Sequence, residues 1–373
     1  MPAEPEIFLL AGEPSGDRAG AELARALRRR IPGARLAGLG GDGMRAAGVE
    51  LLEHVDRLAI LGFAEVVRHL PRLARLRRRV ERRILERRPA LVVAIDYPGF
   101  NLPVAETVRR RGIPVLWYVV PQVWAWREGR AARLGRAADA VCAVLPFEPD
   151  FLARHGVAAT FVGHPVLDSP PVEARPPLEE ADRAPRLGLF PGSRAQEVRR
   201  MLPRFLAAAA ELQRERPDLT VHVARAPGLP PRLYARCPPG TLAPPAEVIA
   251  GSDAAIAKSG TVTLELAAAG VAMTVGYRLH PLSFALARRL VRVPHVSLVN
   301  LVAGRALVPE RIQGDLTPGT LAADVRPLLV AGSERRRAMR EGLADVTRRL
   351  GGAGAADRVA AIAVTLIGSG SGR

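Results

Sequence analysis

The sequence has almost no lysine and few cysteines, although it is strongly basic. Of its 54 lysine and arginine residues only Lys258 is a lysine, and the formal net charge is +17. A charge of this size favours a polyanionic partner, such as nucleic acid or an anionic membrane surface. Because the arginines are spread along the whole chain, we predict no nucleic-acid partner and favour an anionic membrane surface or an acidic substrate.

Motifs for metals and for several enzyme classes are also missing. Cys142 and Cys237 have no metal-binding spacing and cannot form a disulfide framework, which is typical of the reducing cytosol. The seven histidines form no H-E-x-x-H or similar spacing, so we predict no metal site and no cofactor. The absence of a P-loop and of a G-x-S-x-G motif disfavours a P-loop kinase and a serine hydrolase.

Long apolar runs are absent too. No stretch has 18 uncharged apolar residues, and the apolar start 7–11 follows no basic region. We therefore expect a cytoplasmic chain that is neither exported nor membrane-spanning.

Size and patterning predict two α/β domains. A chain of 373 residues with 48% hydrophobic residues exceeds one ordinary domain and can bury a core. Short apolar runs alternate with helical patterns, which indicates doubly wound parallel sheets. The expected strands are 7–10, 34–39, 91–95, 115–119, 140–145, 187–190, 221–224, 254–257 and 272–275. The Pro-rich stretch 166–185 lacks apolar periodicity and predicts a linker between domains at 1–165 and 186–345, with a C-terminal helix and frayed tail at 346–373.

Two loops of the first domain follow predicted strands and carry candidate site residues. Glu13, Ser15 and Gly16 lie where the first strand ends, at the sheet edge where ligands bind in such folds. Alternatively, Ser15 or Asp17 caps the following helix. Asp96 directly follows the strand 91–95, so its carboxylate is placed to act as a general base; the alternative is an Asp that forms the turn before Pro98.

A third glycine-rich segment has two interpretations. Gly38, Gly40 and Gly43 have the G-x-G-x-x-G spacing of a dinucleotide-binding turn. They follow the second predicted strand rather than the first, so we favour a tight strand-to-helix turn without a ligand.

The second domain has two loops suited to a nucleotide. Gly192, Ser193 and Arg194 lead from a strand into a helix, which would aim amides and a guanidinium at a diphosphate. Ser259, Gly260 and Thr261 lead similarly into a helix whose first turn holds Glu265. The Glu265 carboxylate can accept ribose hydroxyls, or it can simply favour the positive helix end.

One helical segment is basic and amphipathic. Apolar residues recur at helical spacing between Phe63 and Ile84, while 72–88 contains nine arginines. Such a helix can lie on anionic lipid, or it can pack its apolar stripe on the sheet and expose its arginines to water. Residue patterns alone leave both interpretations open.

Ten short strings, in order, resemble the lipid-A-disaccharide synthase family of bacterial glycosyltransferases. They are AGEPSGD at 11–17, GLGGDGM at 38–44, LAILGFAEV at 58–66, IDYPGFN at 95–101, PQVWAWR at 121–127, LPFE at 145–148, GHP at 163–165, PGSR at 191–194, SGTVTLE at 259–265 and VSLVNLVAGR at 296–305.

The resemblance implies a GT-B fold, in which two Rossmann-like domains face across a cleft. It implies transfer of 2,3-diacylglucosamine from UDP to the 6-hydroxyl of 2,3-diacylglucosamine 1-phosphate, called lipid X, with release of UDP. Asp96 would be the general base, Arg194 would be essential for activity, and Asn300 would belong to the active-site segment. The scheme requires no divalent metal, and its acylated substrates favour peripheral contact with the inner face of the cytoplasmic membrane.

The resemblance is not complete. Gly99 stands where many members have a second acid, and Val299 stands where a proline is usual. Family members can form homodimers by exchanging C-terminal segments, so a homodimer is possible here. The alternative functions are another UDP-sugar GT-B enzyme, such as a MurG-like transferase or a nucleotide-sugar epimerase, and a non-catalytic basic protein.

Overall fold

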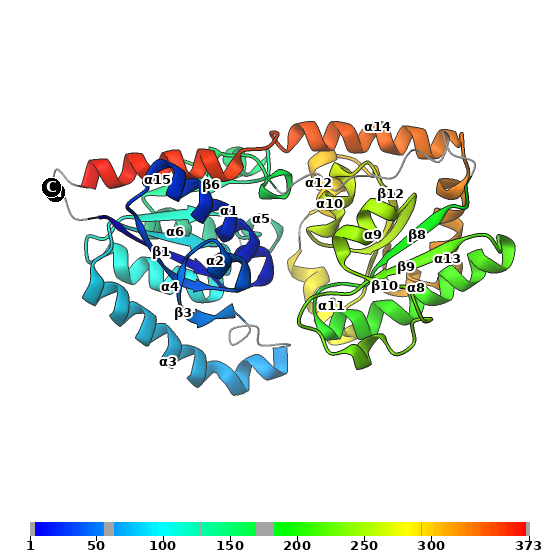
Figure 1. Ribbon diagram of the computed structural model, residues 1–373, viewed down its shortest axis with the longest axis horizontal. Helices are drawn as coiled ribbons and strands as arrows, with labels where there is room; N and C mark the ends of the chain where they lie inside the picture. The colour runs from blue at the N-terminus through cyan, green and yellow to red at the C-terminus, as the bar shows by residue number, and fades with distance from the viewer. Residues whose placement is uncertain (1–3, 56–62, 127, 169–182, 292, 371–373) are drawn as a thin grey trace. The chain divides into compact units, whose positions relative to one another are not determined.

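The computed structural model of the protein describes residues 4–55, 63–126, 128–168, 183–291 and 293–370. The chain divides into two compact units (Figure 1). Unit 1 comprises the residues up to Asp168 together with those from Gly351 onward, and unit 2 runs from Ser169 to Leu350. The C-terminal residues therefore group with unit 1, whereas the sequence analysis gave 346–373 as a segment of its own.

Unit 1 is built on one sheet of seven strands in the order β3-β2-β1-β4-β5-β6-β7. The strands are β1 (Glu6–Ala11), β2 (Arg35–Gly40), β3 (Glu50–His54), β4 (Leu91–Ile95), β5 (Val115–Tyr118), β6 (Ala140–Ala143) and β7 (Thr160–Phe161). All neighbouring pairs are parallel, which confirms the predicted parallel sheet. The central strands are apolar throughout because helices cover both of their faces.

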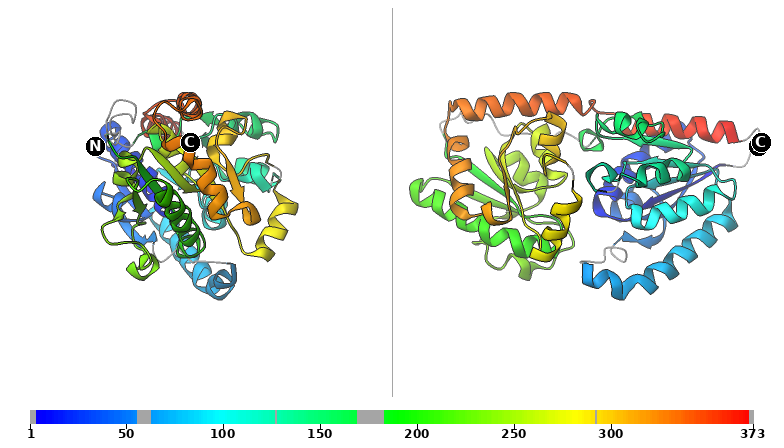
Figure 2. Two further views of the ribbon diagram at one scale, coloured as in Figure 1. Left: turned by 90° about the vertical axis from the view of Figure 1, so that its right-hand side faces the viewer. Right: turned by 180° about the vertical axis from the view of Figure 1, so that it is seen from behind.

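Helices form a layer on each face of this sheet. They are α1 (Pro14–Arg30), α2 (Asp42–Ala46), α3 (Phe63–Arg87), α4 (Pro98–Arg109), α5 (Val123–Trp126), α6 (Arg130–Ala137), α7 (Glu148–Ala153) and α15 (Ala355–Gly370), with a 3-10 turn at Pro165–Leu167. α15 packs beside α1 on one face, and α4 packs between α3 and α6 on the other. Figure 2 (right) shows the face that α3, α4 and α6 cover.

Unit 2 repeats this plan with a sheet of six strands in the order β10-β9-β8-β11-β12-β13. The strands are β8 (Arg186–Phe190), β9 (Thr220–Ala224), β10 (Leu242–Ala243), β11 (Ala254–Lys258), β12 (Ala272–Tyr277) and β13 (Glu310–Ile312). These pairs are parallel as well. Both units therefore have the doubly wound form that the sequence predicted.

The helices of unit 2 also form two layers. They are α8 (Ala195–Glu215), α9 (Pro245–Gly251), α10 (Val262–Ala268), α11 (Pro281–Leu290), α12 (Leu298–Ala303), α13 (Pro318–Val325) and α14 (Glu334–Arg349), with 3-10 turns at Pro231–Tyr234, Gln313–Asp315 and Arg326–Leu329. α13 packs against α8, while α10, α12 and α14 pack together.

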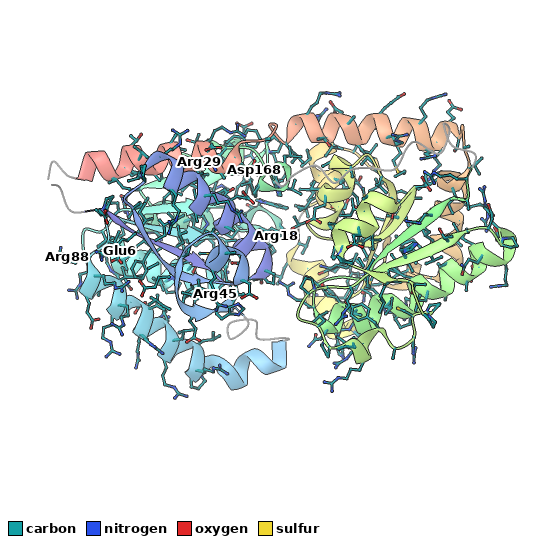
Figure 3. The ribbon with its side chains drawn as sticks, in the orientation of Figure 1. Glu6, Arg18, Arg29, Arg45, Arg88 and Asp168 are labelled. Atoms are coloured by element: carbon teal, nitrogen blue, oxygen red, sulfur yellow. The ribbon has the colours of Figure 1, made fainter. Side chains whose placement is uncertain are left out.

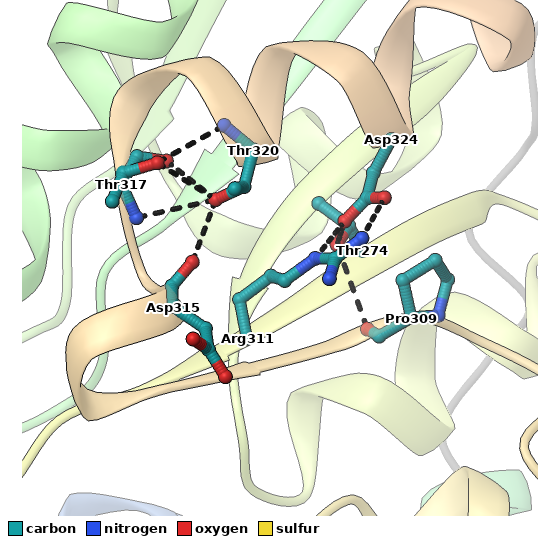
Figure 4. A network of polar contacts seen from close by, with 7 residues as sticks. All are labelled: Thr274, Pro309, Arg311, Asp315, Thr317, Thr320 and Asp324. Atoms are coloured by element: carbon teal, nitrogen blue, oxygen red, sulfur yellow. Dashed lines mark hydrogen bonds and ion pairs between the residues drawn. The ribbon is translucent and has the colours of Figure 1, made fainter.

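A polar network fastens α13 to the edge of the second sheet (Figure 4). The Asp324 carboxylate, 5% exposed, accepts a hydrogen bond from Arg311 Nε at 2.7 Å and one from Thr274 Oγ1 at 3.1 Å. The buried charge is therefore paired and hydrogen-bonded, as burial requires. It ties strands β13 and β12 to the helix above them.

A single aspartate anchors the start of α15 in unit 1. The Asp168 carboxylate accepts hydrogen bonds from the amides of Gly354, Ala355 and Ala356 at 2.7, 3.0 and 2.7 Å. These are amides that a helix start leaves without helical partners, so Asp168 caps α15 from a distant part of the chain. Figure 3 labels Asp168 and also Arg29 of α1, which pairs with Asp357 of α15.

The structure departs from the sequence analysis mainly at edges and ends. Four strands were not predicted from the sequence, namely β3, β7, β10 and β13. They are short strands at the sheet edges, with mostly half-exposed residues and no long apolar run. We predicted that the residues from Gly368 onward, at the end of the segment 346–373, are frayed; this is wrong in part, since α15 continues to Gly370. The linker prediction at 166–185 falls largely outside the described residues.

Candidate active site

Strand order reverses in unit 1 between β1 and β4, and the loops after both strands open at this switch point. Ala11 of β1 lies opposite Ile95 of β4, so Gly12 and Asp96 follow at the same edge of the sheet. In open α/β sheets this is the place where ligands bind. Glu13 is half-buried, Ser15 is exposed and Gly16 is buried there.

The backbone is strained at the candidate base. Asp96 and Tyr97 have φ values of 46° and 49°, in the left-handed region that L residues with side chains rarely adopt. Each such residue costs on the order of 1–3 kcal/mol, and strain of this kind gathers at functional sites. Val119, at the end of the neighbouring β5, also has a positive φ of 66°.

Asn101 holds this strained turn. The side chain is 1% exposed, and Nδ2 donates to Leu10 O at 2.9 Å and to Asp96 O at 2.8 Å. One amide thus connects the ends of β1 and β4 and fixes the backbone that carries Asp96. Sequence reasoning did not single out Asn101, although it ends the IDYPGFN string.

Gly12 and Tyr97 make the two loops fit together. A Cβ atom at Gly12 would lie 2.1 Å from Tyr97 Cδ1, so only glycine leaves space for the ring. Any larger residue at this position would displace Tyr97 and the strained turn with it. The AGEPSGD and IDYPGFN segments are therefore one structural element.

Asp17 decides between the interpretations of two other motifs. Its carboxylate, 9% exposed, accepts hydrogen bonds from the amides of Gly41, Gly43 and Met44 at 2.6, 3.0 and 3.0 Å. The predicted cap by Ser15 or Asp17 is wrong, because the N-cap residue is Glu13 and no side chain caps it. The glycine-rich segment is a strand-to-helix turn, since the amides that a pyrophosphate would need already bind Asp17.

Glu148 is a further acid near Asp96 that sequence reasoning missed. It is 1% exposed and accepts hydrogen bonds from the amides of Val144 and Leu145, both at 2.9 Å, and from Trp124 Nε1 at 3.1 Å. Burial raises the pKa of Glu148 to about 7, and the negative charge of Asp96 adds to the rise. Its only signal in the sequence was its place in the LPFE string.

Unit 2 has its own switch point, between β8 and β11. Gly192 follows β8 with φ 116°, and a Cβ there would lie 2.5 Å from Glu197 Oε2. Glu197 Oε2 accepts hydrogen bonds from the amides of Ser193 at 3.0 Å and Arg194 at 3.3 Å. These two amides were expected to point at an anion and instead bind Glu197 in the first turn of α8, whereas the Arg194 side chain is 49% exposed.

The second loop of unit 2 follows β11. Ser259 Oγ donates to Val296 O at 2.7 Å and the residue is 7% exposed, so this hydroxyl holds the loop rather than a ligand. Gly260 and Thr261 are half-buried, and Thr261 is the N-cap residue of α10. Glu265 lies on the first turn of α10, as predicted, and is half-buried.

Asn300 is fully buried and uses both ends of its amide. Nδ2 donates to Val308 O at 2.9 Å and to Glu310 Oε1 at 2.8 Å, and Oδ1 accepts from the amides of Leu307 and Val308, both at 2.9 Å. The resemblance implied that Asn300 belongs to the active-site segment, and we predicted that it binds substrate. The structure instead makes it the support of the segment 296–310, because contact with substrate would break these bonds.

The described residues lack two features, a cluster of metal ligands and a membrane-spanning helix. Their His, Cys, Asp and Glu side chains include no group of three or more placed to hold a metal ion. None of their helices combines the length and the apolarity that crossing a bilayer requires.

Comparison with known proteins identifies the family. The family model described as lipid-A-disaccharide synthetase matches residues 7–350. The lipid-A-disaccharide synthase of Myxococcus xanthus is 38% identical over 386 residues, which cover 98% of this chain and 99% of the relative. The chain belongs to the lipid-A-disaccharide synthase family. The synthase of Acidobacterium capsulatum is 40% identical, with 97% and 96% of the two chains covered.

Solved structures confirm the GT-B fold. The glycotransferase of kitacinnamycin has a TM-score of 0.65 at 18% identity and covers 98% of this chain and 100% of its own. MurG of Acinetobacter baumannii has a TM-score of 0.57 at 16% identity, with 97% and 99% covered. A UDP-GlcNAc 2-epimerase shares the fold at 10% identity, with 98% and 100% covered, and a TM-score of 0.61. At such identities the likeness shows the fold alone, and family membership makes the chain a glycosyltransferase.

The two departures from the family pattern have simple local settings. Gly99 is exposed near the start of α4, and a Cβ there would meet no atom within 4 Å. Val299 is the second residue of α12 and is fully buried. Proline is also tolerated in the first turn of a helix, so either residue suits this position.

Proposed function

We propose that the protein transfers 2,3-diacylglucosamine from UDP to the 6-hydroxyl of 2,3-diacylglucosamine 1-phosphate. The observation that carries the proposal is about 40% identity with lipid-A-disaccharide synthases over nearly the whole length of both chains. The fold alone is shared with transferases and epimerases, so it does not choose the substrates.

In the proposed reaction Asp96 accepts the proton of the acceptor hydroxyl. The hydroxyl oxygen then bonds to the anomeric carbon of the donor as the bond from that carbon to the diphosphate oxygen breaks. The half-buried carboxylate, fixed by its strained turn, suits this task. A positioned base of this kind contributes about 10²- to 10⁴-fold in rate.

The leaving UDP gains negative charge, which Arg194 would stabilise. Its guanidinium is 49% exposed at the start of α8, where the positive helix end adds to its effect. Gly192, Gly260, Thr261 and Glu265 would surround the nucleotide. The cation belongs to the protein itself, so the scheme uses no divalent metal.

We also propose peripheral contact with an anionic membrane surface through α3, at the cytoplasmic face. In its described part the apolar stripe is covered, with Val80 and Ile84 buried, whereas the arginines from Arg72 to Arg83 are largely exposed. Exposed arginines attract anionic lipid by about 1 kcal/mol each. Sedimentation with phosphatidylglycerol vesicles at rising salt tests this, and equal binding to phosphatidylcholine vesicles would oppose it.

One incubation tests the reaction. The protein is mixed with UDP-2,3-diacylglucosamine and 2,3-diacylglucosamine 1-phosphate, and mass spectrometry follows the disaccharide phosphate and UDP. Release of UDP without the disaccharide would oppose the proposed acceptor. A homodimer remains a further proposal, and light scattering at two protein concentrations tests it.

A further inference from the structure

The one lysine of the chain lies at the switch point of unit 2. Lys258 ends β11, directly before Ser259, and its side chain is only 16% exposed. Nζ lies 3.0 Å from Glu197 Oε1 and 5.4 Å from the centroid of the Tyr277 ring. A cation in this setting is held on two sides, by a carboxylate and by the face of an aromatic ring.

Glu197 connects this lysine to the other loop of the site. Its Oε2 atom accepts hydrogen bonds from the amides of Ser193 and Arg194. Its Oε1 atom contacts Lys258 Nζ and lies 3.5 Å from Arg194 Nη1. Burial acts to raise the pKa of Glu197, but the charges of Lys258 and Arg194 and the hydrogen bonds from Lys258 and the Ser193 amide together outweigh it, and the pKa ends below its usual range. The ionised carboxylate therefore links the loop after β8 to the strand β11.

We propose that the Lys258–Glu197 ion pair positions Arg194 for the diphosphate of the nucleotide sugar. Lys258 is thus a positioning residue that acts through Glu197, and this inference rests on the proposed function of the same site. Without the charged pair, the side chain of residue 197 would no longer be held between Lys258 and the amides of Ser193 and Arg194. The Arg194 guanidinium would then lose its fixed place at the start of α8 and would contribute little to binding an incoming phosphate.

The compact shape of lysine fits this role. A Cβ on Gly260 would lie 3.7 Å from Lys258 Nζ, and the Tyr277 ring covers the same ammonium. A guanidinium is planar and wider than an ammonium and carries its charge over a fork of three nitrogens. An arginine at position 258 would keep the charge but would move the carboxylate that it binds.

Calorimetric titration with UDP tests the proposal in a cycle of variants. Removing only one member of the pair leaves a half-buried charge alone, so the background variant is the neutral pair Glu197→Gln with Lys258→Met. In the wild-type protein we expect Arg194→Ala to weaken UDP binding by about 10- to 100-fold. In the neutral-pair background we expect Arg194→Ala to weaken UDP binding by less than about 3-fold. The effects of substitutions on binding are not additive when one residue acts through another.

Two outcomes separate this inference from the proposed function. If wild-type protein binds UDP and Arg194→Ala costs the same in both backgrounds, the inference is overturned and the proposed function stands. If wild-type protein binds no UDP, both are overturned. Thermal unfolding of each variant establishes that it is folded.

Lys258→Arg serves if the neutral pair does not fold. If the lysine only neutralises Glu197, UDP binding will be unchanged, which would overturn the inference. If it positions Arg194, we expect UDP binding to weaken by about 3- to 10-fold at unchanged thermal stability. Wild-type protein is the matched control in each titration.

Discussion

The two units share a strand plan and differ in what they place at the reversal of strand order. In unit 1 this edge holds carboxylates, with Asp96 half-buried in the turn and Glu148 buried within reach of its charge. In unit 2 the corresponding edge holds cations, Arg194 and Lys258. The same scaffold thus presents the proposed base in one unit and the proposed anion-binding site in the other.

The units also differ in how their loops are held. The loop after β4 in unit 1 is strained at Asp96 and Tyr97 and is fixed by the buried amide of Asn101. The loop after β8 in unit 2 reaches positive φ at Gly192, where it costs little, and is fixed by an ion pair. Backbone strain therefore accompanies the fixed orientation of the proposed base, Asp96. The position of the proposed cation, Arg194, depends instead on the charges of Glu197 and Lys258.

The largest effect that this comparison predicts is on turnover when the base loses its charge. Asp96→Asn should reduce the rate by about 10²- to 10⁴-fold, because the amide cannot accept the acceptor proton. Asparagine tolerates the left-handed backbone of position 96 at least as well as aspartate does. The measurement is the rate of disaccharide formation at saturating substrates.

Two controls make the Asp96 experiment specific to unit 1. UDP affinity and the midpoint of thermal unfolding should stay within experimental error of the wild-type values. A near-normal rate in Asp96→Asn would remove Asp96 from the mechanism. Loss of UDP binding in this variant would contradict the proposal that UDP is bound by unit 2 alone.

The next effect concerns the cation of unit 2. Arg194→Ala should reduce the turnover rate by about 10²- to 10³-fold, the usual loss for one donor to developing negative charge. Unlike Asp96→Asn, it should also weaken UDP binding, because in the proposed scheme the guanidinium contacts the diphosphate both before and after transfer. Arg194→Lys is the matched variant and should recover part of both, since it keeps the charge without the bidentate fork. Unchanged UDP affinity in Arg194→Ala would contradict this assignment.

The sequence predicted the central parts of both units. The strand 91–95 was predicted with its observed bounds because a fully buried parallel strand is a continuous apolar run. The loops before Arg194 and Glu265 were placed correctly because strand-to-helix turns leave glycine, serine and proline at their start. Patterns of this kind are local, so one sequence is enough to find them.

The supports of the site were not predicted because they join residues far apart in the chain. Asp17 binds amides of residues 41–44, and Glu148 binds Trp124. In the sequence each acid is simply a carboxylate near a helix start, which usually needs no further partner. Only the packing of α1 on α2, and of α5 near α7, shows that these acids hold loops together.

A third prediction concerns how the stability of the folded protein depends on pH through one histidine of unit 1. Burial lowers the pKa of His164, at the end of unit 1, to about 4, and its Nδ1 accepts a hydrogen bond from the amide of Val166 at 3.1 Å. The unfolded chain therefore binds a proton between about pH 6.5 and pH 4 that the folded chain refuses, so stability falls as pH falls through this window. The full loss is about 3 kcal/mol for this one group.

His164→Asn should remove that part of the pH dependence. Asparagine does not titrate and can still accept from the amide of Val166, as residues at such caps do. The measurement is the denaturant midpoint of both proteins at pH 7 and at pH 4.5, and the difference between the two should be smaller in the variant. An equal drop in both proteins would mean that other groups of the chain cause the acid sensitivity.

The smallest expected effect concerns a carboxylate added beside the loop after β4 in unit 1. Gly99→Asp adds a side chain where no atom lies within 4 Å of the new Cβ, in the first turn of α4. Loss of glycine's freedom in the unfolded chain and a carboxylate near the helix start should together raise the unfolding free energy by about 1 kcal/mol. The maximal rate should stay within about 2-fold of the wild-type rate, because a Cβ at this position displaces no neighbouring atom. A variant that is ten-fold slower would contradict this expectation. It would show that the reaction requires a small, uncharged residue at position 99.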